Sequence, residues 1–234
     1  MAATTATRPR AVAAAAAGSG LVVMEAHHTT YHPSTLRAAE LVRTGVLGDV
    51  ESAEAAFIVP MPPSSDIRWN LALAGGSLMD LGCYPIRWLR DVLGVQPEVV
   101  SATADDREGI DASMDARLDY AGVAGRVRAA MWTTPPLLID ASVTGTAGTM
   151  RVRMPYQPQA KGRIAVDGPG LKLREKADPK ASYAYQLEAF RDAVAGLDTN
   201  RTGTAAAIET METIDAVYRA AGMNPRVPTG MSTP

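Results

Sequence analysis

The sequence is poor in the residues that mark several protein classes. It has one cysteine, Cys83, which excludes an internal disulfide framework and favours a reducing, cytoplasmic location. Lysine and arginine number 23 against 25 acidic residues, so the chain lacks the basic charge of a nucleic-acid-binding protein. No apolar run approaches the roughly 20 residues that cross a membrane. With 47% apolar residues, the chain is expected to fold as a soluble globular protein without a nucleic-acid or membrane partner.

Signals for a metal or a phosphate are also weak. His27, His28 and His32 lie close together, but no cysteine or carboxylate spacing completes a ligand set, so no metal site is predicted. The dinucleotide-binding motif GxGxxG does not occur in these 234 residues. The pair Gly18 and Gly20 follows a predicted helix instead of opening one, so it does not replace that motif.

The first part of the chain has the pattern of a fragment of a parallel sheet. An alanine-rich helix is predicted at about residues 8–17, followed by a glycine stop and a short apolar strand at 21–26. The other strands of such a sheet are not in this sequence. We therefore expect residues 1–26 to be the remnant of a dinucleotide-binding domain, 27–224 to form a substrate and dimerisation domain, and 225–234 to be a loose tail.

The rest of the chain predicts an α+β fold. Residues 50–59 alternate between apolar and polar, and the same period of two returns after residue 97. This pattern predicts an open, mostly antiparallel sheet of about six strands with helices on one face. Two closing helices are predicted, the first with Tyr183, Leu187, Phe190 and Val194 along one face. The uncovered face of the sheet is expected to pair with a second copy, which gives a homodimer.

The stretch from Gly75 to Gly94 carries the strongest candidate site. It opens with glycines and continues as an apolar-rich helix in which Asp80 and Tyr84, four residues apart, share one face. Pro85 is expected to tighten or kink this helix. The residues alone leave two interpretations open: a proton-handling pair, or an aspartate favoured by the helix dipole beside a tyrosine that merely packs.

Four segments together resemble the Gfo/Idh/MocA family of NAD(P)-dependent oxidoreductases. They are MEAHHTTYHP, LVRTGVLGDVESAEAAF, DIRWNLALAGGSLMDLGCYPIRWLRDVLG and the closing SYAYQLEAFRDAV with ETIDAVYRAAG. The tyrosine form of the central segment is similar to the branch of dimeric dihydrodiol dehydrogenase and glucose–fructose oxidoreductase. The resemblance implies that Tyr84 exchanges a proton with the substrate oxygen and that Asp80 supports it. Arg68, Asn70 and His32 are weaker candidates for the substrate pocket, placed there by their proximity to the central segment.

The resemblance also implies NAD(P) as cofactor, although the match begins after the family's glycine-rich turn and its Glu-Lys-Pro lysine. The expected function is an oxidoreductase acting on a sugar-like or small hydroxylated substrate, truncated and inactive alone. The alternative is a non-catalytic module that binds a sugar or forms a dimer.

Overall fold

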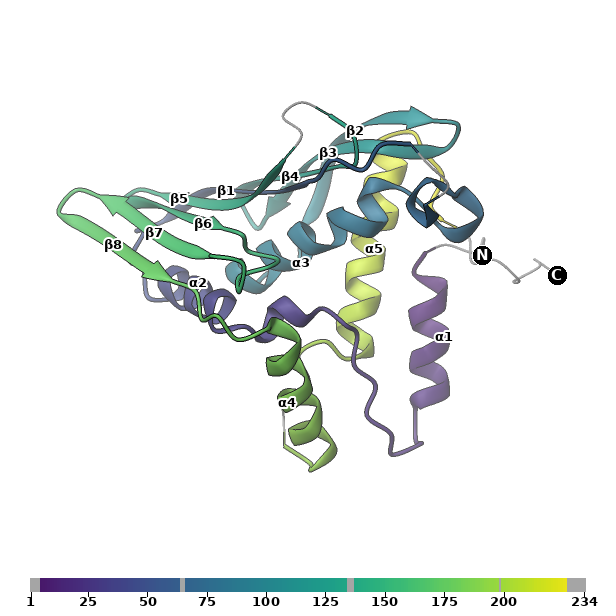
Figure 1. Ribbon diagram of the computed structural model, residues 1–234, viewed down its shortest axis with the longest axis horizontal. Coiled ribbons are helices and arrows are strands. Elements are labelled where there is room, and N and C mark those ends of the chain that lie inside the picture. Colours follow the sequence, from purple (N-terminus) through teal and green to yellow (C-terminus); the bar gives the residue numbers. More distant parts are fainter. Residues whose placement is uncertain (1–4, 64–65, 134–136, 198, 227–234) are drawn as a thin grey trace.

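The computed structural model describes residues 5–63, 66–133, 137–197 and 199–226. One mixed sheet carries five α-helices on one side (Figure 1). The helices are α1 (Thr7–Ala16), α2 (Pro33–Arg43), α3 (Cys83–Leu93), α4 (Ser182–Val194) and α5 (Thr204–Ala220). The strands are β1 (Val50–Ile58), β2 (Glu98–Arg107), β3 (Ile110–Tyr120), β4 (Val123–Ala130), β5 (Leu138–Gly145), β6 (Gly148–Arg153), β7 (Arg163–Gly168) and β8 (Leu171–Lys176).

The sheet has eight strands in the order β2-β3-β4-β1-β5-β6-β7-β8, so the predicted number of about six is wrong. The prediction of a mostly antiparallel sheet is confirmed, because among the described strands only the central pair β1 and β4 is parallel. The edge strand β2 had a weak sequence pattern. Two register shifts, at Val99/Ser101 and at Asp105/Asp106, interrupt its alternation.

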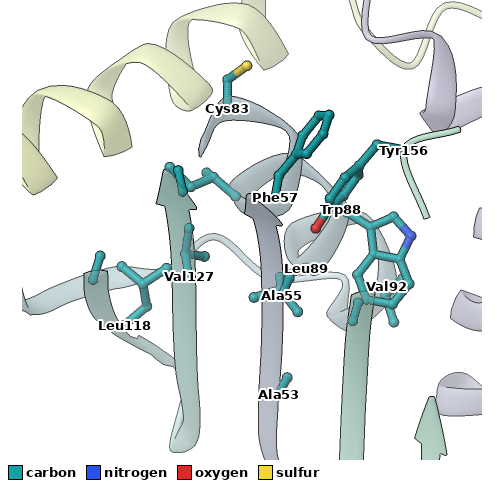
Figure 2. Packing of buried hydrophobic residues seen from close by; sticks show 14 of the residues in the cluster. Ala53, Ala55, Phe57, Cys83, Trp88, Leu89, Val92, Leu118, Val127 and Tyr156 are labelled. Carbon is teal, nitrogen blue, oxygen red and sulfur yellow. The ribbon is translucent and has the colours of Figure 1, made fainter. Parts of the chain in front are cut away.

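The core lies between the sheet and the helices α3 and α5. Ala53, Ala55 and Phe57 point inward from β1, as their period of two predicts. They meet α3, whose Trp88 and Leu89 are at most 1% exposed (Figure 2). Full burial of a side chain such as Leu89 contributes about 1.5–3 kcal/mol, so this contact fixes α3 firmly on the sheet.

The opposite face of the sheet is not covered by any described helix (Figure 1). Its outward side chains are largely charged, and they line a hollow of about 660 Å³ over β1 and β4–β8. Its cations are Arg128, Arg151, Arg153, Arg163, Arg174 and Lys176. This face is therefore open and polar, in contrast with the apolar face beneath the helices.

Two expectations for secondary elements are corrected. Residues 21–26 form no strand, because no neighbouring strand is there to pair with them. Hydrogen bonds to other segments hold these residues instead. In one of them, the backbone N–H of Glu25 donates to the Thr202 carbonyl (2.7 Å). The apolar face of α4 is exposed, with Leu187 and Val194 at 68% and 63%. Ser182 and Gln186 are the buried side chains of this helix, so α4 docks through its polar side.

The expected ends of the chain fall partly outside the described residues. This applies to residues 1–4 and to 227–234 of the predicted tail. Arg226, within that predicted tail, is only 5% exposed. In the described part of the chain, no helix combines the length and the hydropathy needed to span a bilayer.

A buried network centred on Asp111 joins β3, α5 and the segment before α3. Asp111 is fully buried, and its Oδ1 accepts from the Tyr218 hydroxyl (3.0 Å) and from Arg226 Nη2 (2.7 Å). Its Oδ2 accepts from the Ser77 hydroxyl (2.9 Å) and from the backbone N–H of Leu78 (2.6 Å). Burial raises the pKa of the Asp111 carboxyl, and these donors oppose that effect. Four donors thus compensate one carboxylate that water does not reach.

We predict that Arg226→Met lowers the free energy of unfolding by about 3–5 kcal/mol, because it leaves the Asp111 carboxylate buried without its cation. Urea unfolding monitored by circular dichroism measures the loss. The matched control is Arg107→Met, which breaks the exposed pair with Asp105 and should cost less than about 1 kcal/mol. Equal losses in the two variants would contradict the proposed importance of the buried pair.

Candidate functional site

Two glycines fold the loop after residue 65 back onto the start of the α3 region. The backbone N–H groups of Gly75 and Gly76 donate to the carbonyls of Asn70 and Arg68, both at 3.0 Å. A Cβ at Gly75 would meet the Arg68 carbonyl oxygen at 2.5 Å, which is too close for any other residue. Gly76 has φ +137° and lies against Asp111, so it also requires glycine. The glycine pair therefore holds Arg68 next to the helix that follows.

The helix begins with an irregular turn. Leu78–Gly82 form a π-helical turn, and the backbone N–H of Cys83 donates to the carbonyl of Leu78, five residues back. Pro85 follows within the first turn of α3 and has no N–H to continue the regular pattern. The sequence predicts that Pro85 tightens or kinks the helix; the irregular turn of the structure lies just before it, at Leu78–Gly82. Such π-turns are common at functional sites, and this one carries Asp80.

Asp80 and Arg68 form an ion pair at the mouth of a pocket. Arg68 Nε donates to Asp80 Oδ2 at 2.6 Å, and its Nη1 lies 3.2 Å from Asp66 Oδ1. The side chains of Arg68 and Asp80 are 34% and 30% exposed, so the pair is accessible from solvent. Sequence reasoning placed Arg68 and Asp80 near each other but did not predict that they pair. Their contact depends on the loop folding back through the glycines.

Tyr84 lies deeper in the same pocket among aromatic rings. Its ring centroid is 5.4 Å from that of His27, 5.6 Å from that of Phe57 and 5.9 Å from that of Tyr156. The pKa of Tyr84 is raised to about 12, mainly by burial and in smaller part by Cys83, Tyr183 and Asp80, whereas Arg68 lowers it. The hydroxyl has no hydrogen-bond partner among the described residues, and it is not one of the fully buried unpaired atoms. Tyr84 therefore presents a neutral, unpaired phenol to the pocket at neutral pH.

The pocket has a volume of about 610 Å³ and combines an apolar wall with a few polar groups. Its aromatic and imidazole rings are those of His28, Phe57, Tyr84, Tyr156 and Tyr183. Its polar side chains are Arg68, Asp80, Gln157 and Gln159. This composition, a largely apolar cavity with few placed polar groups, is typical of a small-molecule site.

The structure brings together three of the five predicted site residues: Tyr84, Asp80 and Arg68. Asp80 and Tyr84 share the pocket without a direct hydrogen bond. The other two lie elsewhere. His32 is fully buried, and its Nδ1 accepts from the backbone N–H of Ser34 at the start of α2. The side chain of Asn70 is exposed and accepts from the N–H of Ala72.

Sequence reasoning missed other pocket residues. His28 was considered only as a metal ligand, and Tyr183 only as part of one apolar face of its helix. Tyr156 lies between β6 and β7 in a segment without periodicity, so no local signal marked it. These residues come from distant parts of the chain, and only the tertiary fold brings them to one pocket.

The residues that line the pocket do not fit the phosphate-bearing part of a dinucleotide. Arg68 is the only lysine or arginine among them, and it is already paired with two carboxylates. The described residues hold no group of three or more histidine, cysteine or acidic side chains arranged for a metal ion. The donor set suits a neutral, oxygen-bearing molecule instead.

Comparison with known proteins places the chain in a family. Residues 35–151 match the GFO/IDH/MocA C-terminal domain. The chain belongs to the Gfo/Idh/MocA family. It is 34% identical over 206 residues to the D-xylose 1-dehydrogenase (NADP(+)) 2 of Haloferax volcanii, which covers 87% of this chain and 63% of that protein. The chain thus spans less than two thirds of this Gfo/Idh/MocA relative.

Two further Gfo/Idh/MocA matches extend the comparison. The trans-1,2-dihydrobenzene-1,2-diol dehydrogenase of Mus musculus is 32% identical over 155 residues, covering 64% of this chain and 45% of that protein. Among solved structures, the aldose-aldose oxidoreductase from Caulobacter crescentus, complexed with glycerol, superposes with a TM-score of 0.85. It is 23% identical and the match covers 94% of this chain and 67% of that one, so it supports the fold.

We predict that the Tyr84 phenol stays protonated well above pH 10 and that Arg68→Met raises its pKa further. Arg68 is the cation that favours the phenolate, so its removal disfavours the charged form. NMR titration of the protein labelled at the tyrosine Cζ measures this pKa, and Tyr84→Phe assigns the signal. A midpoint near 10, or no upward shift in Arg68→Met, would contradict this assignment of the local electrostatics.

Proposed function

We propose that this chain carries the substrate side of an NAD(P)-dependent oxidoreductase acting on a sugar-like or small hydroxylated compound. The observation that carries the proposal is the unpaired hydroxyl of Tyr84, which faces a pocket of about 610 Å³ with few polar groups. The names of the relatives support the substrate class, since they include a D-xylose dehydrogenase and an aldose-aldose oxidoreductase.

In this proposal Tyr84 is the group that exchanges a proton with the substrate. A phenol with a pKa of about 12 is neutral at pH 7, so it begins as a donor to an oxygen that gains negative charge. Arg68, held by Asp80, lowers the pKa and so stabilises the phenolate left after the proton moves. Asp80 then acts indirectly, because it fixes the position of Arg68.

The cofactor of the proposal is NAD(P), and most of its binding surface is expected outside the residues described here. The donor set of the pocket supports this, since it offers no free cation for a pyrophosphate. The D-xylose dehydrogenase of Haloferax volcanii, which the chain matches over 63% of its length, is named for its use of NADP(+).

The proposal predicts that Tyr84→Phe lowers turnover by about 10² or more, because the group that gives a proton to the carbonyl in reduction, and takes it from the hydroxyl in oxidation, is lost. The assay uses the enzyme completed by a nucleotide-binding domain, read from upstream DNA in the same frame or added by fusion. NADP reduction with D-xylose as the trial substrate measures turnover.

The matched control is Tyr185→Phe, which removes a hydroxyl from a tyrosine that does not line this pocket. It should leave turnover unchanged. If Tyr84→Phe also retains full turnover, Tyr84 has no part in the reaction. A completed protein that binds D-xylose but never oxidises it would favour the non-catalytic sugar-binding module instead.

We further propose that the chain forms a homodimer through the open face of its sheet. The supporting observation is that no described helix covers this face, whose hollow is lined by Ser142 and Ala165 among other residues. A sheet with one uncovered face is commonly buried by a second copy.

Light scattering is expected to give a dimer for the wild type and a monomer for Ala165→Arg, because the new side chain and its charge project into the interface. Ala14→Arg, on an exposed position of α1, is the control and should remain a dimer. A wild-type protein that is monomeric at high micromolar concentration would contradict the proposal.

A further inference from the structure

His28 has an unusual position among the pocket residues. It opens the short 3-10 helix His28–Tyr31, and its ring lies on that of Tyr183 with centroids 4.0 Å apart. It also lies near Tyr84, with ring centroids 6.0 Å apart. The residue is 5% exposed and lines the pocket. Its ring is therefore clamped between neighbours and has one edge at the cavity.

The neighbours of His28 determine which ring nitrogen carries the proton. Nδ1 lies 2.7 Å from the Ser182 hydroxyl oxygen. Ser182 is fully buried, and its hydroxyl donates to Gln159 Oε1 at 3.3 Å. Since a hydroxyl has one proton to donate, the Ser182 oxygen is left to accept from Nδ1–H of His28. With the Gln159 amide oxygen facing Ser182, the chain from His28 through Ser182 to Gln159 favours the Nδ1–H tautomer.

This tautomer leaves Nε2 as a hydrogen-bond acceptor. Nε2 has no hydrogen-bond partner among the described residues, yet it is not one of the fully buried unpaired atoms, whereas Nδ1 of His27 is. Burial and His32 lower the pKa of His28 to about 4, so the ring is uncharged at pH 7 and the lone pair is available. His28 Nε2 therefore offers the pocket a neutral acceptor, in addition to the donor at Tyr84.

We propose that His28 is a specificity-determining residue whose unprotonated Nε2 accepts a hydrogen bond from a substrate hydroxyl while Tyr84 engages the reacting oxygen. The inference rests on the proposed function of this pocket and adds a selection rule to it. A site with a buried acceptor favours ligands that donate to it, because a ligand without the hydroxyl leaves that acceptor unpaired. The preferred substrate therefore carries at least one hydroxyl besides the oxygen that reacts.

NMR of the full 234-residue chain with ¹⁵N-labelled histidine tests the inference without a cofactor. The wild-type spectrum is expected to show His28 as the Nδ1–H tautomer at pH 7. D-xylose should then shift the Nε2 signal of His28 together with the ring signals of Tyr84. His28→Phe assigns the histidine signals.

The same titration in His28→Phe gives the energetic test. This variant keeps an aromatic ring against Tyr183 but loses the acceptor. It should weaken D-xylose binding by about fivefold to tenfold, the effect of one lost hydrogen bond. Cyclohexanone, a six-membered ring with a carbonyl and no hydroxyl, should bind both proteins equally.

The outcomes separate the two proposals. If D-xylose shifts Tyr84 but leaves His28 Nε2 unchanged, the role of His28 is overturned and the proposed function stands. If neither residue responds to D-xylose, both proposals are overturned. An Nε2–H tautomer in the wild type would overturn the role of His28 even if His28→Phe does not fold.

Discussion

The buried carboxylate of Asp111 is the interaction on which the geometry of the pocket depends. It joins β3 in the sheet, Tyr218 on α5 and the backbone at Leu78, where the π-helical turn begins. Arg226 completes the charge balance and also donates to the Gly75 carbonyl at 3.0 Å. One side of the network thus fixes the glycine pair, and the other fixes the start of the helix that carries Asp80 and Tyr84.

This arrangement explains why a turn with poor intrinsic stability persists. A π-helical turn followed by a proline leaves backbone groups that a regular helix would satisfy, and Gly76 adopts a backbone conformation closed to other residues. Such costs are tolerated when the surroundings determine the conformation more strongly than the local sequence does. Here Asp111 and the close contact of Gly75 with the Arg68 carbonyl provide that constraint. The distortion brings Arg68 and Asp80 together beside the phenol.

Sequence patterns predicted those parts of the molecule that local periodicity determines. The closing helices, the alternation of β1 and the central Tyr84 helix all have such patterns, and the family resemblance was confirmed. The prediction of a strand at 21–26 was wrong, because an apolar run becomes a strand only where another strand pairs with it. The sequence does not predict which face of α4 is buried, because a helical period of apolar residues is equally consistent with packing and with exposure. Leu187 is apolar and periodic, yet Gln186 is the residue that docks, through a bond to the Glu25 carbonyl (2.7 Å).

The pocket was harder to predict than the fold because the residues that line it come from a span of more than 150 residues, from His28 to Tyr183. His28 and Ser182 meet only because α4 packs against the 3-10 helix beginning at His28. Their hydrogen bond, together with that from Ser182 to Gln159, favours one tautomer of His28. A contact between distant segments thus influences the chemistry of a side chain that looks ordinary in the sequence. His32, four residues later, is also a buried histidine, but its Nδ1 accepts from the backbone N–H of Ser34 and caps α2.

The electrostatics of the pocket indicate which kind of ligand it suits. Arg68 is neutralised by Asp66 and Asp80, and His28 is uncharged, so the site presents little net charge to its ligand. A neutral phenol and a neutral imidazole acceptor suit hydroxyl and carbonyl oxygens, whereas phosphate groups require cations or free backbone N–H groups. The lining of this pocket thus suits a neutral, oxygen-bearing ligand better than a phosphate group. Tyr183 lines the pocket and also begins the exposed apolar face of α4, so the pocket borders an uncovered apolar surface.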